Sequence, residues 1–158
     1  GSGCVATKVE MPGVTPEMIE WWFIWHGQQD LRYKVWCPTH HYAAHVLEKD
    51  LPRRLDKSLS LKERNWNTTD VVTEDVGAGP QKMHLSFFSP EDYGYDRELI
   101  PNAKVIVSAN VKDPETGMGL VTFQVASSIV PITGRDITLM KTEKLWLWPF
   151  RREDSPWR

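Results

Sequence analysis

Apolar and polar residues alternate along several segments of the chain, and this period of two is typical of half-buried β-strands. Turn-forming residues separate two of the later segments, where Pro-Glu-Thr-Gly occupies 114–117. We predict strands at residues 5–11, 31–36, 68–75, 82–88, 104–113, 118–130 and 136–147. Since most of these segments lie late in the chain, the sequence predicts an α+β fold with mostly antiparallel strands.

Residues 17–26 interrupt the alternation with a dense apolar segment that includes three tryptophans. Thr15 is suited to cap the N-terminus of a helix there, Pro16 to occupy its first position and Gly27 to end it. Apolar side chains cover most of the circumference of this helix. We therefore predict a helix that is buried on nearly all sides and forms a wall of the domain.

Two further segments are assigned from cap, breaker and charge signals. Thr39 can cap a short helix from His40 to about Lys49, which Pro52 closes. Residues 53–64 are rich in charge and are predicted to form an exposed loop. The chain has no internal repeat and no low-complexity segment.

Composition narrows the classes of function. The chain has 158 residues, 41% hydrophobic and 25% charged, and its net charge of -2 comes without a long basic run. Nucleic-acid binding through neutralised phosphates is therefore not expected. The apolar run at 21–25 is too short to span a membrane, and no signal peptide is visible. Two cysteines do not make a disulfide framework, so we expect reduced thiols in a cytoplasmic protein.

The side chains that could carry chemistry are concentrated in residues 20–46, which contain four tryptophans, four histidines and two tyrosines. The tryptophans suit either a packed core or an aromatic cavity for a flat ligand, and both interpretations stay open. On a helix, His41, His45 and Glu48 would share one face at a spacing that can bind zinc. Glu74 lies at the end of a predicted strand, where acidic side chains are usually solvated. We would expect a chemical role for it only if a histidine lay opposite.

Four segments resemble those of a known family: MPGVTPEMIEWWFIWHG, LRYKVWCPTHHY, ERNWNTTDVVTEDVGAGP and GYDRELI. They occur in this order, with similar spacing, in the 2,4-diacetylphloroglucinol hydrolase family, which the chain resembles over about residues 1–125. The resemblance implies a helix-grip fold of the Bet v 1/START type, in which a curved antiparallel sheet and a long C-terminal helix enclose a ligand cavity. That helix is not evident here, so we expect a single domain at 1–158 that lacks part of the family's N-terminal and C-terminal regions.

The resemblance also implies an activity and a site. The family is one of zinc-dependent hydrolases that cleave the carbon–carbon bond between an acyl group and a phenolic, phloroglucinol-like ring. Two histidines and two glutamates hold the zinc, and the resemblance makes His41 and Glu74 two of these ligands, while His45 becomes a neighbour. Tyr33 corresponds to a tyrosine near the substrate, and we predict catalytic and substrate-binding roles for it on a strand that faces the cavity.

Several departures from the family's pattern keep a second interpretation open. The other two ligands form a His-x-x-x-Glu motif that is missing after residue 127. Ala109 stands where the resemblance places a catalytic histidine, Ala44 replaces an asparagine and Cys37 an aspartate. The chain is expected to be either the hydrolase or a small-molecule binding or non-hydrolytic isomerase/cyclase module that uses the same cavity. In either case we expect a small aromatic or polyketide-like ligand, no nucleic acid and no membrane, and leave a homodimer open.

Overall fold

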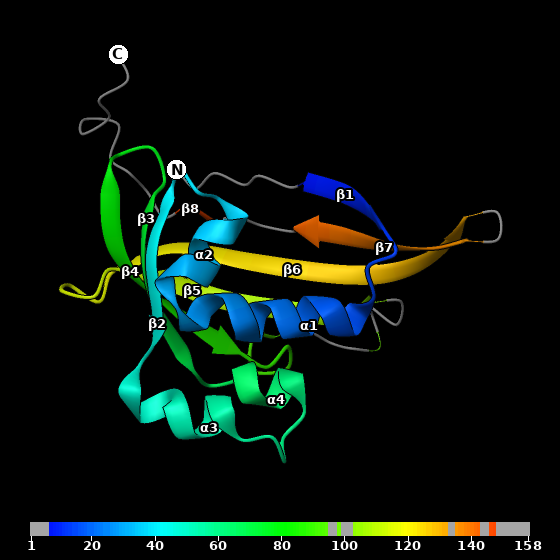
Figure 1. Cartoon of the computed structure of the whole chain (residues 1–158), viewed down its shortest axis with the longest axis horizontal. Coiled ribbons are helices and arrows are strands. Elements are labelled where there is room, and N and C mark those ends of the chain that lie inside the picture. The colour runs from blue at the N-terminus through cyan, green and yellow to red at the C-terminus, as the bar shows by residue number, and fades with distance from the viewer. Residues whose placement is uncertain (1–6, 95–97, 99–102, 133–134, 143–145, 148–158) are drawn as a thin grey trace.

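The computed structural model describes the backbone of residues 7–94, 98, 103–132, 135–142 and 146–147, and the side chains of 11–94, 98 and 103–119. Within these residues, eight strands form one sheet with antiparallel pairing throughout (Figure 1). Their order is β1-β7-β6-β5-β4-β3-β2, and β8 pairs with β6 outside this path. The strands are β1 (Thr7–Pro12), β2 (His41–Val46), β3 (Thr69–Asp75), β4 (Pro80–Phe88), β5 (Ala103–Lys112), β6 (Gly119–Ile132), β7 (Arg135–Thr142) and β8 (Trp146–Leu147).

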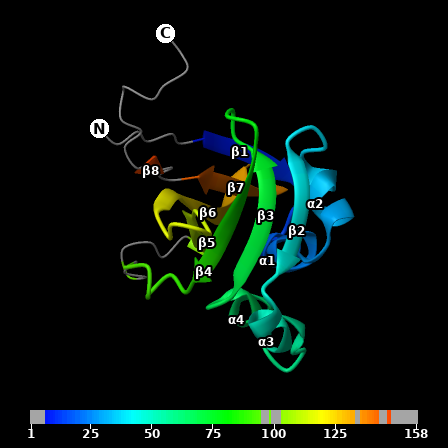
Figure 2. The ribbon, with the colours of Figure 1, turned by 90° about the vertical axis from the view of Figure 1, so that its left-hand side faces the viewer.

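Helices cover one side of this sheet, which we call its inner face. The helical elements are α1 (Pro16–Trp25), η1 (His26–Gln28), α2 (Asp30–Trp36), η2 (Glu48–Asp50), α3 (Leu51–Leu55) and α4 (Leu61–Asn65). Figure 2 shows α1 and α2 on the same side of β3 and β4. In Figure 1, β2 and β3 run steeply, whereas β6 and β7 run nearly horizontally above α1, so the sheet bends from one end to the other. The α+β prediction is confirmed, and no helix in the described residues is long and apolar enough to cross a bilayer.

Helix α1 begins as predicted but is buried on one face only. The Thr15 side chain accepts a hydrogen bond from the backbone N–H of Met18 at 3.3 Å, and Pro16 occupies the first turn. Phe23 is buried against the sheet, whereas Met18 is 53% exposed and Trp21 46% exposed. The expectation of burial on nearly all sides is wrong, because α1 lies on the sheet and its opposite face stays open.

Three predicted elements differ from the structure. Residues 31–36 belong to helix α2 instead of a strand, and most of residues 40–49 form strand β2 instead of a helix. The predicted loop at 53–64 contains parts of α3 and α4. The alternation at 31–36 was misleading because Leu31 and Val35 are 78% and 63% exposed, so their apolar spacing does not mark a buried face.

Contacts with distant residues and a helix cap explain the other two differences. Strand β2 pairs with β3, and the backbone N–H of Ala44 donates a hydrogen bond of 2.9 Å to the Asp30 side chain of α2. These contacts outweigh the helix signal of a short segment. Ser60 and Glu63 form a capping box that starts α4, and their S-x-x-E spacing is visible in the sequence.

Two clusters of buried apolar side chains lie between the helices and the sheet. The first joins α1 to β4 and β5, the second joins α2 to β2, β3, β4 and β5, and Leu85 packs against both. The first consists of Ile19, Phe23, Phe87, Val105, Val107 and Ala109, and the second of Tyr33, Ala44, Val72, Met83 and Val111. The second cluster fixes α2 over the ends of β2 and β3, where the candidate site lies.

Candidate functional site

His41 and Glu74 lie opposite each other on the paired strands β2 and β3. The pairing contains a bulge at Tyr42, where β2 has one residue more than β3. Residues that oppose each other in an antiparallel pair share a face, so His41 shares the face of Glu74, and Ala44 that of Val72. Because Val72 and Glu74 are two residues apart on β3, all four side chains belong to the inner face.

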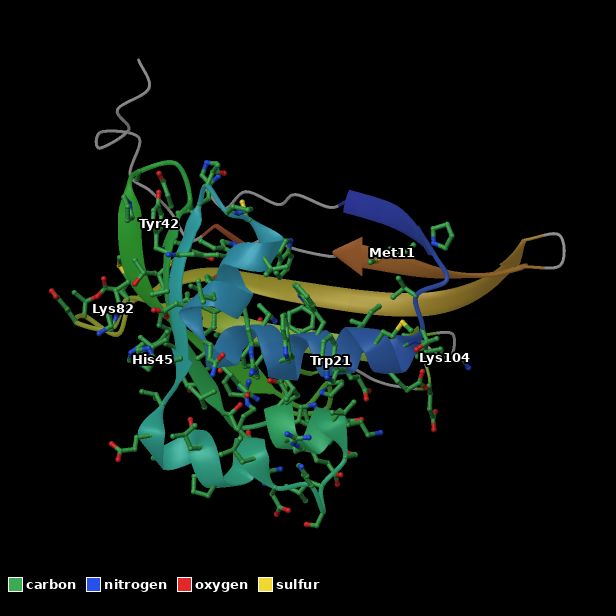
Figure 3. The ribbon with its side chains drawn as sticks, viewed as in Figure 1. Met11, Trp21, Tyr42, His45, Lys82 and Lys104 are labelled. Carbon is green, nitrogen blue, oxygen red and sulfur yellow. The ribbon has the colours of Figure 1, made fainter. Side chains whose placement is uncertain are left out.

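Because of this bulge, the side chains of His41 and His45 lie on opposite faces of the sheet. Strand β2 carries His45 opposite Val71, so His45 lies on the outer face, where it is exposed (Figure 3). The helical face that would have combined these histidines with Glu48 does not exist, because the segment is a strand. Across the described part of the chain, no group of three or more His, Cys, Asp or Glu side chains is placed to hold a metal ion.

Tyr33 reaches the site from helix α2 and not from a strand, so that part of the prediction is wrong. Its hydroxyl donates a hydrogen bond to the Glu74 carboxylate. Its ring stacks on the His41 ring, with centroids 4.1 Å apart and an interplanar angle of 12°. The structure thus brings the three predicted site residues into direct contact, while their chemical roles stay predictions.

A hydrogen bond to the backbone of α2 fixes the orientation of the His41 ring. The His41 Nδ1 atom lies 3.2 Å from the carbonyl oxygen of Tyr33. Because a carbonyl only accepts, Nδ1 carries the hydrogen, and a neutral ring then leaves Nε2 with a free lone pair. That Nε2 atom lies 3.5 Å from Oε2 of Glu74. Metal-binding histidines commonly have their second nitrogen held in this way.

The spacing of these two donor atoms fits one zinc ion. Zinc binds histidine nitrogen and carboxylate oxygen at about 2.0–2.2 Å in a tetrahedron, which separates neighbouring donor atoms by about 3.4 Å. The observed 3.5 Å between His41 Nε2 and Glu74 Oε2 agrees with this separation. Both side chains are partly exposed, at 16% and 19%, so an ion from solvent can reach them. These two donor atoms are therefore spaced as two ligands of a tetrahedral zinc ion would be.

Tyr33 is a neutral hydrogen-bond donor in this arrangement. Burial raises the pKa of its hydroxyl well above the ordinary value, and the charge and hydrogen bond of Glu74 raise it further. Only 3% of the residue is exposed. The proton therefore stays on Tyr33 at neutral pH, and the hydroxyl orients the Glu74 carboxylate.

Aromatic rings form a wall beside the site. Trp36, at the end of α2, meets the His41 ring edge-on at 5.7 Å and 80°, and is 51% exposed. Trp22 and Trp25 of α1 pack with centroids 5.6 Å apart. A pocket between α1, α4 and β5 lies elsewhere, since its lining includes none of the three site residues. The tryptophans serve as partly exposed packing here, and a ligand cavity at the site stays a prediction.

The sequence did not reveal a buried ion pair next to the site. Arg54 Nη2 donates to Asp70 Oδ1 at 2.7 Å and to the Thr68 hydroxyl at 2.6 Å, and Arg54 is fully buried. Burial raises the pKa of the Asp70 carboxyl, and the Arg54 guanidinium opposes that rise. A side chain at Gly27 would place its Cβ 2.1 Å from Asp70 Oδ2. Gly27 is therefore required for this close approach, a role that its position after the helix does not signal.

Fold and site together define a class of protein: an α+β domain in which a helix-borne tyrosine meets a histidine and a glutamate from two paired strands. A comparison with known protein families identifies the family to which this domain belongs. The family model described as the DAPG hydrolase PhiG domain matches residues 1–126. The chain belongs to this family, and the resemblance found in the sequence is confirmed.

Curated relatives are hydrolases by name. Phloretin hydrolase from Eubacterium ramulus is 39% identical over 105 residues, which cover 66% of this chain and 38% of the relative. A 2,4-diacetylphloroglucinol hydrolase from Pseudomonas sp. is 34% identical over 101 residues, 64% of this chain and 34% of the relative. The same enzyme of Pseudomonas protegens matches at 34% over 101 residues, 64% of this chain and 32% of the relative. The chain spans about a third of the length of the curated relatives it matches.

Proposed function

We propose that this chain supplies part of the active site of a zinc-dependent hydrolase. The enzyme would cleave the carbon–carbon bond between an acyl group and a phenolic, phloroglucinol-like ring. The observation that carries the proposal is the pair of His41 Nε2 and Glu74 Oε2, 3.5 Å apart, with the histidine held by the carbonyl of Tyr33. Membership in the family and the names phloretin hydrolase and 2,4-diacetylphloroglucinol hydrolase support the reaction and the substrate class.

His41 and Glu74 would hold the zinc as two of its donors, and groups beyond the described residues, or water, would complete the set. When bound, the ion would supply a Lewis acid that polarises the acyl carbonyl of the substrate. In the overall reaction the bond from the ring carbon to the carbonyl carbon breaks. Water provides a hydroxyl group to the acyl fragment, and the ring carbon gains a proton.

Tyr33 would orient the substrate ring in this site. Its proton is engaged with Glu74, so the lone pairs of its oxygen remain to accept a hydrogen bond from a phenolic hydroxyl of the substrate. The half-exposed Trp36 beside His41 would present an apolar surface to a flat ring. The bent sheet with helices on its inner face supports the finer fold assignment, a helix-grip domain of the Bet v 1/START type whose inner face lines the cavity.

Two buried alanines favour a second candidate function. Ala44 and Ala109 lie on the inner face and are 1% and 0% exposed. An alanine side chain can neither donate nor accept a proton, whereas the family resemblance places an asparagine and a histidine at these positions. The second candidate is therefore a small-molecule binding or non-hydrolytic isomerase/cyclase module that uses the same inner face.

Zinc content and turnover distinguish the two candidates. We expect about one zinc per chain in the purified protein, and its loss in His41→Ala and Glu74→Gln. His45→Ala is the matched control, because it removes a histidine from the outer face of the same strand and should retain the metal. Deacylation of phloretin and of 2,4-diacetylphloroglucinol should fall with the metal and in Tyr33→Phe. Metal-free wild-type protein that binds a flat phenolic ligand without turnover would contradict the hydrolase and favour the second candidate.

A further inference from the structure

Four aromatic rings form one nearly parallel column that ends at His41. Trp22 stacks on His26 with centroids 5.2 Å apart and an angle of 7°. His26 stacks on Tyr33 at 5.8 Å and 15°, and Tyr33 stacks on His41 at 4.1 Å and 12°. The rings come in turn from α1, η1, α2 and β2. Tyr33 is therefore held on both faces, by the proposed zinc ligand on one side and by His26 on the other.

His26 is itself held in a single orientation. Its Nδ1 atom lies 2.6 Å from the carbonyl oxygen of Trp22, and its backbone N–H donates to the same carbonyl. The rings of Trp36 and Phe23 meet it edge-on, each with centroids 5.4 Å away. Only 5% of His26 is exposed. Burial also lowers its pKa to about 4, so the ring is neutral at pH 7 and its Nδ1 hydrogen serves the bond to Trp22.

The plane of the Tyr33 ring determines the direction in which its hydroxyl donates, because a phenolic O–H prefers to lie in the plane of its ring. Functional groups in a site must be held to within about 10–20° of the productive geometry by neighbours that are themselves fixed. The His41 ring alone cannot do this, because it depends in turn on the carbonyl of Tyr33. On the other face of Tyr33, only the fixed ring of His26 stacks in the described part of the chain.

We propose that His26 is a positioning residue of the site: its ring fixes the plane of Tyr33 and thereby the hydrogen bond from Tyr33 to Glu74. The part that concerns zinc rests on the proposed function, since it takes Glu74 as a ligand. Partners that orient a ligand typically change metal affinity by about 10–100-fold. His26 acts through Tyr33 and is not itself a ligand.

Two substitutions separate the ring of His26 from its hydrogen bond. His26→Phe keeps a stacking ring and loses Nδ1, whereas His26→Asn keeps a donor close to the position of Nδ1 and loses the ring. If His26→Asn does not fold, His26→Leu replaces it as the variant without an aromatic ring. Circular dichroism and the remaining tyrosine signals report whether each variant is folded.

The first measurement needs no metal. NMR of the chain with ¹³C-labelled tyrosine gives ring signals for four tyrosines, and Tyr33→Phe identifies the signal of Tyr33. We expect a large ring-current shift for Tyr33 in the wild type, because imidazole rings lie on both of its faces. His26→Phe should preserve a ring-current shift, and the folded variant without the ring should move the signal toward the solvent-exposed value. An unchanged signal in that variant would overturn the positioning role.

The second measurement is zinc affinity, obtained by competition with a chromophoric chelator. His26→Asn should weaken zinc binding about tenfold or more, and His26→Phe should stay close to wild type. In a Tyr33→Phe background, His26→Asn should have no further effect, because the hydroxyl through which it acts is gone. An equal loss in both backgrounds would indicate general loosening and overturn the proposal. If the wild type binds no zinc, the proposed function fails, and the NMR comparison alone decides the role of His26.

Discussion

His26 should make the stability of the domain depend on pH below neutrality. Burial lowers its pKa from the ordinary value of 6.5 to about 4 in the folded protein. In the unfolded chain the ring is solvated and keeps the ordinary value. As the pH falls, the unfolded state therefore binds a proton before the folded state does. The contribution of neutral His26 is complete above pH 7 and is lost progressively between about pH 6.5 and pH 4.

The magnitude follows from the difference between the two pKa values. A separation from 6.5 to about 4, at 1.36 kcal/mol for each pH unit, gives a loss of about 3 kcal/mol in the free energy of unfolding. Most of this loss, about 2.5 kcal/mol, should be reached at about pH 4.5. For a domain of this length, about 3 kcal/mol corresponds to roughly 6–12 °C in Tm.

Urea unfolding of wild type and His26→Phe, followed from pH 7.5 to pH 4 with a chelator present, isolates this contribution. The other titrating groups are common to both proteins, so they largely cancel in the difference between the two free energies. The difference should be constant above pH 7 and shift by about 2.5 kcal/mol against the wild type by about pH 4.5. His45→Ala, which removes an exposed histidine from β2, is the control for the loss of a histidine side chain as such. A constant difference across the whole range would refute the reasoning, because His26 would then titrate alike in both states.

Three further predictions concern the packing around the site. Gly27→Ala should destabilise the domain by about 3 kcal/mol in urea unfolding, because the added Cβ would displace Asp70 from Arg54. If this variant is as stable as the wild type, Asp70 can move without cost and the prediction is wrong. Arg54→Met should cost about 3–5 kcal/mol by leaving the Asp70 carboxylate buried and unpaired, and adding Asp70→Leu should recover much of it. If the double variant is as unstable as the single one, the cost lies in packing. Ser60→Ala should lower Tm by a few degrees through loss of the cap on α4, while Ser60→Asp should not, and equal melting of the two would count against the cap.

The elements that the sequence predicts correctly are those whose local signals agree with their burial. Thr15 and Pro16 mark the start of α1, and β3, β4 and β5 alternate or carry β-branched residues as half-buried strands do. In α2 the local signal and the burial disagree, because the apolar Leu31 and Val35 face solvent. That helix and the neighbouring strand are fixed by contacts between segments, such as the hydrogen bond from Ala44 to Asp30.

In the candidate site, too, part of the arrangement follows from the sequence and part depends on contacts between segments. The resemblance to the family identifies His41, Glu74 and Tyr33 as site residues. Their convergence, however, depends on a bulge and on a helix that the residue pattern does not predict. His26 carries no signal of its own in the sequence, because its position after α1 is also that of an ordinary helix end. Its importance appears only when the rings from four elements are seen to stack.

The extra residue at Tyr42 determines which positions of β2 are useful for protein engineering. In a regular strand, positions three apart would point to opposite faces. Here His41 and Ala44 share the inner face, so a polar side chain introduced at position 44 would lie on the same face as His41, the proposed zinc ligand. Positions 43 and 45 lead to the outer face and could be varied for solubility instead. A library that aims to change the chemistry of this domain should therefore be focused on position 44 and on position 109, whose alanine also lies on the inner face.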